Sequence, residues 1–175
     1  MTTPGAANTG PANTGPASTG QANDRRGRER AALAEAIALS RASLGVSTPN
    51  PPVGAVVLDA DGSVVGRGTT EAPGGRHAEV VALDEAGTRA RHGTIVVTLE
   101  PCDHQGRTGP CTARILSAGI ARVVYGAADL KAGAVGSLYN LSCDPRLNHE
   151  FPVESGVRAD ECAALLTEFF AALRM

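Results

Sequence analysis

Apolar positions along the chain predict two amphipathic helices, one near each end of the folded region. The first starts at Glu29 and ends near Gly45, where a turn-forming STPNPP run follows. Its apolar side chains, at helical spacing, are Leu33, Ile37 and Leu44. The second covers 159–174, and its apolar side chains are Cys162, Leu165, Leu166, Phe169 and Leu173. Each helix therefore has an apolar face to bury.

Short apolar runs between these helices predict strands. VGAVVLD (53–59) and VVGRG (64–68) flank a DADG turn and indicate a hairpin. TIVVTLE (94–100) and ARVVYGA (121–127) are nearly continuous apolar runs, which are typical of strands buried on both faces. The stretch between 128 and 158 shows no such pattern and is expected to be irregular.

Helices are also expected over 77–90 and 111–118, so strands alternate with helices after the opening hairpin. This order predicts an α/β fold, a three-layer α/β/α sandwich with a mixed central sheet of about five strands. In such sheets, functional sites form where strand ends meet helix starts.

The first part of the chain has a different composition. Residues 8–22 read NTGPA, NTGPA and STGQA, three copies of a unit built from small and turn-forming residues. We expect 1–28 to be a disordered, low-complexity tail and 29–175 to form one domain. The arginines of the NDRRGRER run could contact RNA, although a solubilising leader is the simpler interpretation.

Overall charge and hydropathy exclude several classes of protein. The chain has 16 basic and 18 acidic residues, so a whole-protein positive field for capturing nucleic acid is not expected. It contains no apolar run long enough to span a bilayer and no signal-peptide pattern. We therefore expect a cytoplasmic protein that does not associate with membranes.

Cytoplasmic cysteines that lie close together more often bind metal than form disulfides. Cys102 and Cys111 are separated by eight residues, and Cys111 follows Pro110 at an expected helix start. The positive end of a helix dipole favours a thiolate at that position. Cys143 and Cys162 are instead assigned to packing.

A histidine begins the helix expected over 77–90. His77, Cys102 and Cys111 offer one imidazole and two thiolates, the ligand types that Zn²⁺ prefers. Three protein ligands leave a fourth position for water, which is typical of catalytic rather than structural zinc sites. These residues therefore predict a zinc site with hydrolytic chemistry.

Glu79 lies two residues after His77, about 200° further round an ideal helix. It is better placed to face a water molecule at the metal than the metal itself, so we expect it to act as general acid and base. A zinc module that only stabilises structure or binds a partner would have no use for this glutamate. Glu79 therefore discriminates between an enzyme and a structural zinc module.

A His-x-Glu sequence followed by Pro-Cys and a second cysteine is the signature of zinc-dependent deaminases, although their second cysteine usually follows after two residues. The runs PNPPVGAVV, GGRHAEVVAL, VTLEPCDHQGRTGPC and ILSAGIARVVYG closely resemble the deaminase domain of the bacterial riboflavin pathway. That enzyme deaminates a phosphoribosylated diaminopyrimidinone. The resemblance covers 30–128 and includes the eight-residue cysteine spacing.

This resemblance implies the cytidine deaminase-like fold, zinc on the three predicted ligands and a proton-shuttle role for Glu79. It further implies that Asn50 and His104 face the substrate and that Arg107 helps to bind its anionic part. One departure matters: Thr69 and Thr70 stand where the riboflavin enzymes usually have Trp-His, and that histidine lies in the substrate pocket.

The C-terminal region, 129–175, resembles the tail of bacterial tRNA-specific adenosine deaminase. Its seven acidic residues outnumber its four basic ones, which does not suit contact with phosphates. Glu150 also stands where that family generally has arginine after Asn-His. Nucleic acid is therefore not expected as a partner.

The leading hypothesis is a zinc-dependent hydrolytic deaminase that converts a small amino-substituted nitrogen heterocycle, resembling a nucleobase, pyrimidine or pterin, to the carbonyl compound and ammonia. The riboflavin-pathway step, tRNA adenosine deamination and a non-catalytic zinc module remain alternatives, in that order. A homodimer is expected by resemblance to related enzymes.

Overall fold

The computed structural model describes residues 19–105 and 109–174. Their helices and strands, in chain order, are α1 (Thr19–Ala42), β1 (Gly54–Leu58), β2 (Val64–Thr69), α2 (Ala78–Ala86), the 3₁₀ helix Gly87–Ala90, β3 (Thr94–Leu99), α3 (Cys111–Ser117), β4 (Arg122–Ala127), the 3₁₀ helix Leu141–Cys143, β5 (Val153–Glu154) and α4 (Ala159–Ala172). The tandem repeat lies mostly, and Arg107 entirely, outside the described residues.

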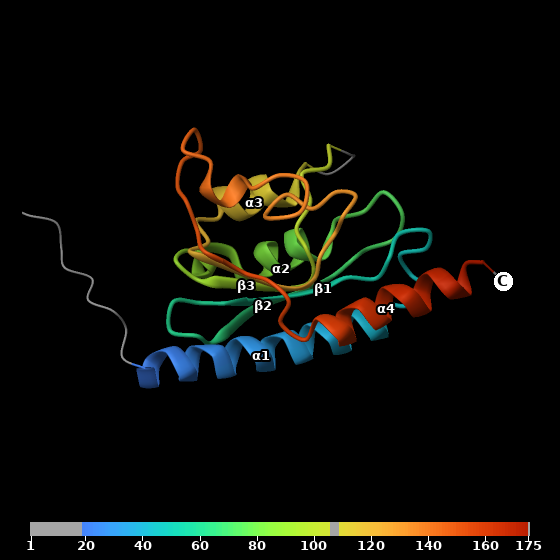
Figure 1. The fold of residues 1–175 in the computed structure, drawn as a ribbon, viewed down its shortest axis with the longest axis horizontal. Coiled ribbons are helices and arrows are strands. Elements are labelled where there is room, and N and C mark those ends of the chain that lie inside the picture. The colour runs from blue at the N-terminus through green and yellow to red at the C-terminus, as the bar shows by residue number, and fades with distance from the viewer. Residues whose placement is uncertain (1–18, 106–108, 175) are drawn as a thin grey trace, which may run out of the picture.

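The five strands form one mixed sheet in the order β2-β1-β3-β4-β5. β1 is antiparallel to both β2 and β3, whereas β3, β4 and β5 run parallel. Helices α1 and α4 cover one face of the sheet, and α2 and α3 cover the other (Figure 1). The predicted three-layer α/β/α sandwich is therefore confirmed.

Alternate side chains of the strands enter two separate cores, which explains the continuous apolar runs. The core beneath α2 and α3 contains Ala55, Val57, Ile95, Val97, Val123 and Tyr125. The core beneath α1 and α4 contains Val56, Leu58, Val96 and Val124. Each central strand is thus buried on both faces.

Two glycines of β2 allow α2 to lie very close to the sheet. A Cβ atom on Gly66 would come within 2.1 Å of the Ala82 carbonyl oxygen, and one on Gly68 within 2.1 Å of the Ala78 carbonyl oxygen. Any side chain at either position would displace the helix. This close packing fixes the start of α2, where His77 and Glu79 lie.

The first helix starts earlier than the apolar pattern predicted. Helix α1 starts at Thr19 rather than Glu29, so 19–28 is helical and not part of a disordered tail. This segment is polar and contains three arginines, which favour helix, and i,i+4 ion pairs join Arg28 to Asp24 and Arg25 to Glu29. A search for apolar periodicity alone does not detect such a helix.

Three other expectations at the level of single elements were wrong. Leu44 lies beyond the end of α1 and is 46% exposed, and Leu173 at the end of α4 is also exposed. Cys143 was assigned to packing but is exposed, whereas Cys162 is buried as predicted. β5 lies in the stretch expected to be irregular, and the sequence did not reveal it because two residues are too few to show alternation.

Among the described residues, no helix has the length and apolarity to cross a bilayer.

Candidate active site

The three predicted zinc ligands come from three different elements and meet at one edge of the sheet. His77 is the residue immediately before α2, Cys102 follows the end of β3, and Cys111 is the first residue of α3. The carboxyl end of a central strand therefore faces the amino ends of two helices, as expected for an α/β fold.

The distances between the ligand atoms suit a tetrahedral zinc site. The two Sγ atoms are 3.7 Å apart, and His77 Nδ1 lies 3.6 Å from Cys102 Sγ and 3.2 Å from Cys111 Sγ. Zinc–sulfur bonds of about 2.3 Å and zinc–nitrogen bonds of about 2.0–2.1 Å require separations of about 3.8 Å and about 3.6 Å, respectively. These residues can therefore hold zinc with little rearrangement.

The ligands already interact electrostatically with one another. The pKa of the Cys102 thiol falls to about 3, chiefly because Cys111 donates a hydrogen bond to its thiolate. The same contact raises the pKa of Cys111, and the hydrogen bond to Cys102 raises that of His77. Cys102 is thus the ligand that is ready as a thiolate, and zinc binding would displace the proton of Cys111.

Glu79 lies beside this cluster, in the first turn of α2, and only 4% of the residue is exposed. Burial raises the pKa of its carboxyl to about 7, and the Cys102 thiolate adds to the shift. A carboxyl with a pKa near neutrality can both accept and return a proton. Its surroundings therefore suit the general acid and base role predicted from the sequence.

A cavity of about 220 Å³ opens beside the ligand cluster. Its lining includes Glu79, Asn50, His104 and Thr70. The structure thus places Asn50 and His104 in the wall of this cavity, while Arg107 lies outside the described residues. The Thr70 hydroxyl accepts a hydrogen bond from the Val53 amide at 3.1 Å, so it joins β1 to the end of β2.

Sequence reasoning missed several residues that line the same cavity, among them Glu100, Asp129 and Ala132. Glu100 could have been noticed as a carboxylate directly after an apolar strand and two residues before a predicted ligand. Asp129 and Ala132 carry no comparable signal, because only the fold brings 129–137 next to Cys102.

A His-Cys-Cys cluster beside a buried glutamate, on an α/β/α sandwich, defines the class of zinc-dependent deaminases. Comparison with known families agrees with this. Residues 26–127 match the family described as the cytidine and deoxycytidylate deaminase zinc-binding region. The match covers more than half of the chain, which therefore belongs to this family.

Individual relatives include riboflavin biosynthesis protein RibD of Mycobacterium tuberculosis, with 44% identity over 133 residues. That alignment covers 76% of this chain but 38% of the relative. A solved structure of a diaminohydroxyphosphoribosylaminopyrimidine deaminase/5-amino-6-(5-phosphoribosylamino)uracil reductase from Thermotoga maritima superposes with a TM-score of 0.70 at 35% identity. It covers 83% of this chain and 42% of that protein. The chain thus spans less than half of these relatives.

A third relative has almost the same extent as the matched region. It is a solved structure from a study of A-to-I editing by tRNA:A34 deaminases at the wobble position of transfer RNA. The TM-score is 0.63 at 30% identity, covering 77% of this chain and 98% of the other. The fold is therefore shared by relatives named for two different substrates.

Proposed function

We propose that this zinc-dependent deaminase acts on a small amino-substituted nitrogen heterocycle of the aminopyrimidine type, which it converts to the carbonyl compound and ammonia. The observation that carries this proposal is the position of Glu79, buried beside the His-Cys-Cys cluster in a cavity of about 220 Å³. One acidic group, three zinc ligands and a small cavity together provide what hydrolysis of a ring amine requires.

Zinc, when bound by His77, Cys102 and Cys111, supplies a Lewis acid that lowers the pKa of water toward neutrality. Glu79 then accepts a proton from the attacking water as its oxygen bonds to the ring carbon. The glutamate delivers this proton to the adjacent ring nitrogen. It next passes the second water proton to the amino group, the carbon–nitrogen bond breaks and ammonia leaves.

The size and lining of the cavity support a small substrate. Its volume lies below the about 300–1,000 Å³ that is usual for sites of drug-sized ligands. Asp129 contributes a carboxylate to the wall and Asn50 an amide, and Glu100 adds negative charge although donors of 129–137 engage both its oxygens. Such groups suit the N–H and amino donors of a heterocycle better than a phosphate, which the carboxylates would repel.

The riboflavin-pathway reaction is the second candidate, favoured by the identity to RibD. The residue in doubt is Thr70, which stands where those enzymes usually have a pocket histidine. Thr70 lines the cavity, and its hydroxyl is already engaged by the Val53 amide. Threonine has no imidazole, and its engaged hydroxyl is a poor replacement for one. We therefore place the free heterocycle ahead of the phosphoribosylated one.

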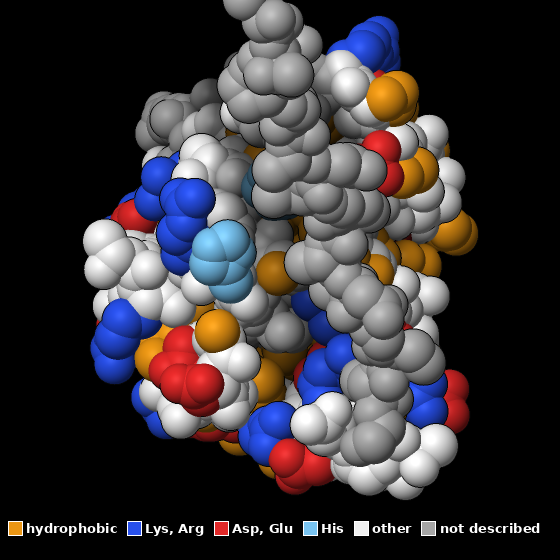
Figure 2. Space-filling model, turned by 90° about the vertical axis from the view of Figure 1, so that its left-hand side faces the viewer, with side chains coloured by type: hydrophobic (Ala, Val, Ile, Leu, Met, Phe, Trp, Pro, Cys, Tyr) orange, Lys and Arg blue, Asp and Glu red, His pale blue; other side chains and the backbone are white. Residues whose placement is uncertain are grey.

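Transfer RNA is the third candidate, favoured by the nearly complete coverage of the tRNA:A34 deaminase structure. Charge argues against it. Region 129–175 has an acidic excess, and basic and acidic side chains are interspersed on the face shown in Figure 2. RNA binding requires a basic surface along the phosphates, so we rank this substrate below the small molecules.

A mass-spectrometric screen tests the substrate class. The zinc-loaded protein is incubated separately with cytosine, adenine, guanine, pterin, the phosphoribosyl diaminopyrimidinone and an anticodon stem-loop. We expect a gain of about 1 Da, the exchange of an amino group for a carbonyl oxygen, in at least one free heterocycle. A reaction confined to the stem-loop or to the phosphoribosyl compound would replace our proposal with the corresponding alternative.

The predicted homodimer belongs to the same proposal. Sedimentation equilibrium of the zinc-loaded protein measures its mass directly. A species of twice the chain mass of 17.8 kDa supports the dimer, and a monomer at micromolar concentration contradicts it.

A further inference from the structure

Glu100 is a buried carboxylate that the proposed chemistry does not use. It follows β3 directly, and only 2% of the residue is exposed. Oε1 accepts hydrogen bonds from the amides of Val135 and Ser137, at 3.2 and 2.9 Å. Oε2 accepts from the Asp129 amide at 3.1 Å and from the Ser137 hydroxyl. Four donors of the segment 129–137 therefore converge on one side chain.

The fit between Glu100 and this segment is close. A Cβ atom on Gly133 would come within 2.3 Å of Glu100 Oε2 and within 2.4 Å of Cδ. Glycine at this position therefore lets the backbone pass directly over the carboxylate. The Ala134 amide also donates to the Pro101 carbonyl at 2.9 Å, so the segment is tied to the LEPC run that leads to zinc ligand Cys102.

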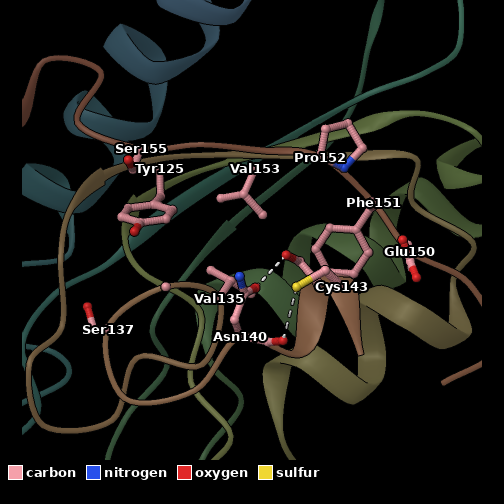
Figure 3. A pocket seen from close by; sticks show the side chains of 12 residues that line it. Tyr125, Val135, Ser137, Asn140, Cys143, Glu150, Phe151, Pro152, Val153 and Ser155 are labelled. Carbon is pink, nitrogen blue, oxygen red and sulfur yellow. Dashed lines mark hydrogen bonds between the residues drawn. The ribbon is translucent and has the colours of Figure 1, made fainter. Parts of the chain in front are cut away.

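The segment lies between two cavities. Asp129 and Ala132 line the cavity of about 220 Å³ beside the zinc ligands, the catalytic cavity, whereas Val135, Gly136 and Ser137 line a second cavity of about 610 Å³. Figure 3 shows Val135, Ser137 and Asn140 on one side of this second cavity, and Phe151 and Pro152 on another. Val135 packs into the core beneath α2 and α3, and the hydrogen bonds to Glu100 hold the parts of the segment that border the two cavities.

We propose that Glu100 is a positioning residue, which holds 129–137 as one wall of the substrate cavity and thereby controls the affinity and choice of substrate. This inference rests on the proposed function, because the wall matters for a small ring bound in that cavity. Glu100 acts through Asp129 and Ala132 and transfers no proton.

The main test replaces Glu100 by glutamine, which has almost the same shape. An amide offers one acceptor oxygen, and its NH₂ group would face donors that now bond to a carboxylate oxygen. We expect E100Q to fold and keep its zinc, but to raise KM about tenfold while kcat changes less than about threefold. KM is measured with the panel compound that reacts fastest.

Glu29 provides a matched control. It is equally buried, at 2% exposure, but lies on α1 and pairs with Arg122 at 2.6 Å, outside the catalytic cavity. E29Q also removes a buried carboxylate charge, and we expect its KM to stay within about twofold of the wild-type value. Equal increases in KM in both variants would overturn the proposal, because the effect would then reflect general loss of stability.

Hydrogen exchange provides a readout that does not depend on activity. The amides of Asp129, Val135 and Ser137 should lose protection at least about tenfold in E100Q and keep it in E29Q. Unchanged protection in E100Q overturns the positioning role, whatever the kinetics. If none of the panel compounds reacts, the proposed function fails while the exchange result still tests Glu100.

A second variant approaches the same contact from the segment. G133A would push a methyl group into the Glu100 carboxylate, so it should repeat the rise in KM and the loss of protection. Gly27, where an added Cβ meets no atom within 4 Å, provides the control G27A. A G133A protein with wild-type KM and wild-type exchange would contradict the proposal.

Discussion

Two buried glutamates line the cavity beside the zinc ligands, and their surroundings give them different tasks. Glu79 lies against the cluster itself, where burial raises its pKa to about 7. Glu100 is surrounded by backbone amides of 129–137, which hold it as an acceptor of hydrogen bonds. Replacing Glu79 should therefore affect the chemical step, whereas replacing Glu100 should affect binding.

The change E79Q removes the proton carrier and keeps the shape of the side chain. We expect kcat to fall by about 10²- to 10⁴-fold, because positioned acid–base catalysis contributes that much. Ammonia release and zinc content are measured on the same preparation, and zinc should be unchanged. E168Q, on the exposed surface of α4, is the control. Wild-type turnover in E79Q would rule out the proton-shuttle role.

The four cysteines allow a matched test of metal binding. Cys111 is buried in the ligand cluster, whereas Cys143 is exposed and lies outside it. We expect C111S to lower zinc affinity by at least about 100-fold, since even residues that only support ligands contribute about 10- to 100-fold. C143S should bind zinc normally in the same chelator competition. Similar affinities in the two variants would show that the cluster is not the zinc site.

At the scale of elements, the contact between β2 and α2 positions two residues of the site, His77 and Glu79. Strand β2 has glycine at the two places where the backbone of α2 approaches most closely. The helix start, with His77 before it and Glu79 within it, depends on that distance. A larger side chain at either glycine of β2 is therefore expected to alter the zinc site by displacing α2.

The change G68V places a branched side chain against the Ala78 carbonyl oxygen. Overpacking of this kind costs about 1–3 kcal/mol, so the urea midpoint should fall. Because the displaced backbone bears His77, zinc affinity should fall as well, while G27A should change neither quantity. A G68V protein with normal stability and normal zinc affinity would show that α2 does not depend on this contact.

At the scale of the whole molecule, local patterns were sufficient to predict the layers and the zinc ligands. The runs over 53–59, 94–100 and 121–127 were each a strand, because continuous apolar runs reflect burial on both faces. His77, Cys102 and Cys111 were identified because each lies at a strand end or helix start, which sequence can locate.

Features that depend on contacts between distant segments could not be predicted in this way. The 129–137 segment reaches the cavity through pairing of Gly133 with Cys102 and hydrogen bonds to Glu100, and no local pattern shows either. The early start of α1 is supported by ion pairs along the helix rather than by an apolar face. The substrate depends on cavity shape, which is set by several of these contacts together.

X-ray absorption at the zinc edge of the purified protein tests the central claim most directly. The structure predicts one zinc per chain with two sulfur ligands at about 2.3 Å and two nitrogen or oxygen ligands at about 2.0–2.1 Å, one of them from solvent. A spectrum showing this shell would match the His77, Cys102 and Cys111 cluster with one open position. Four protein-derived sulfur ligands, or a protein that takes up no zinc at all, would contradict the account.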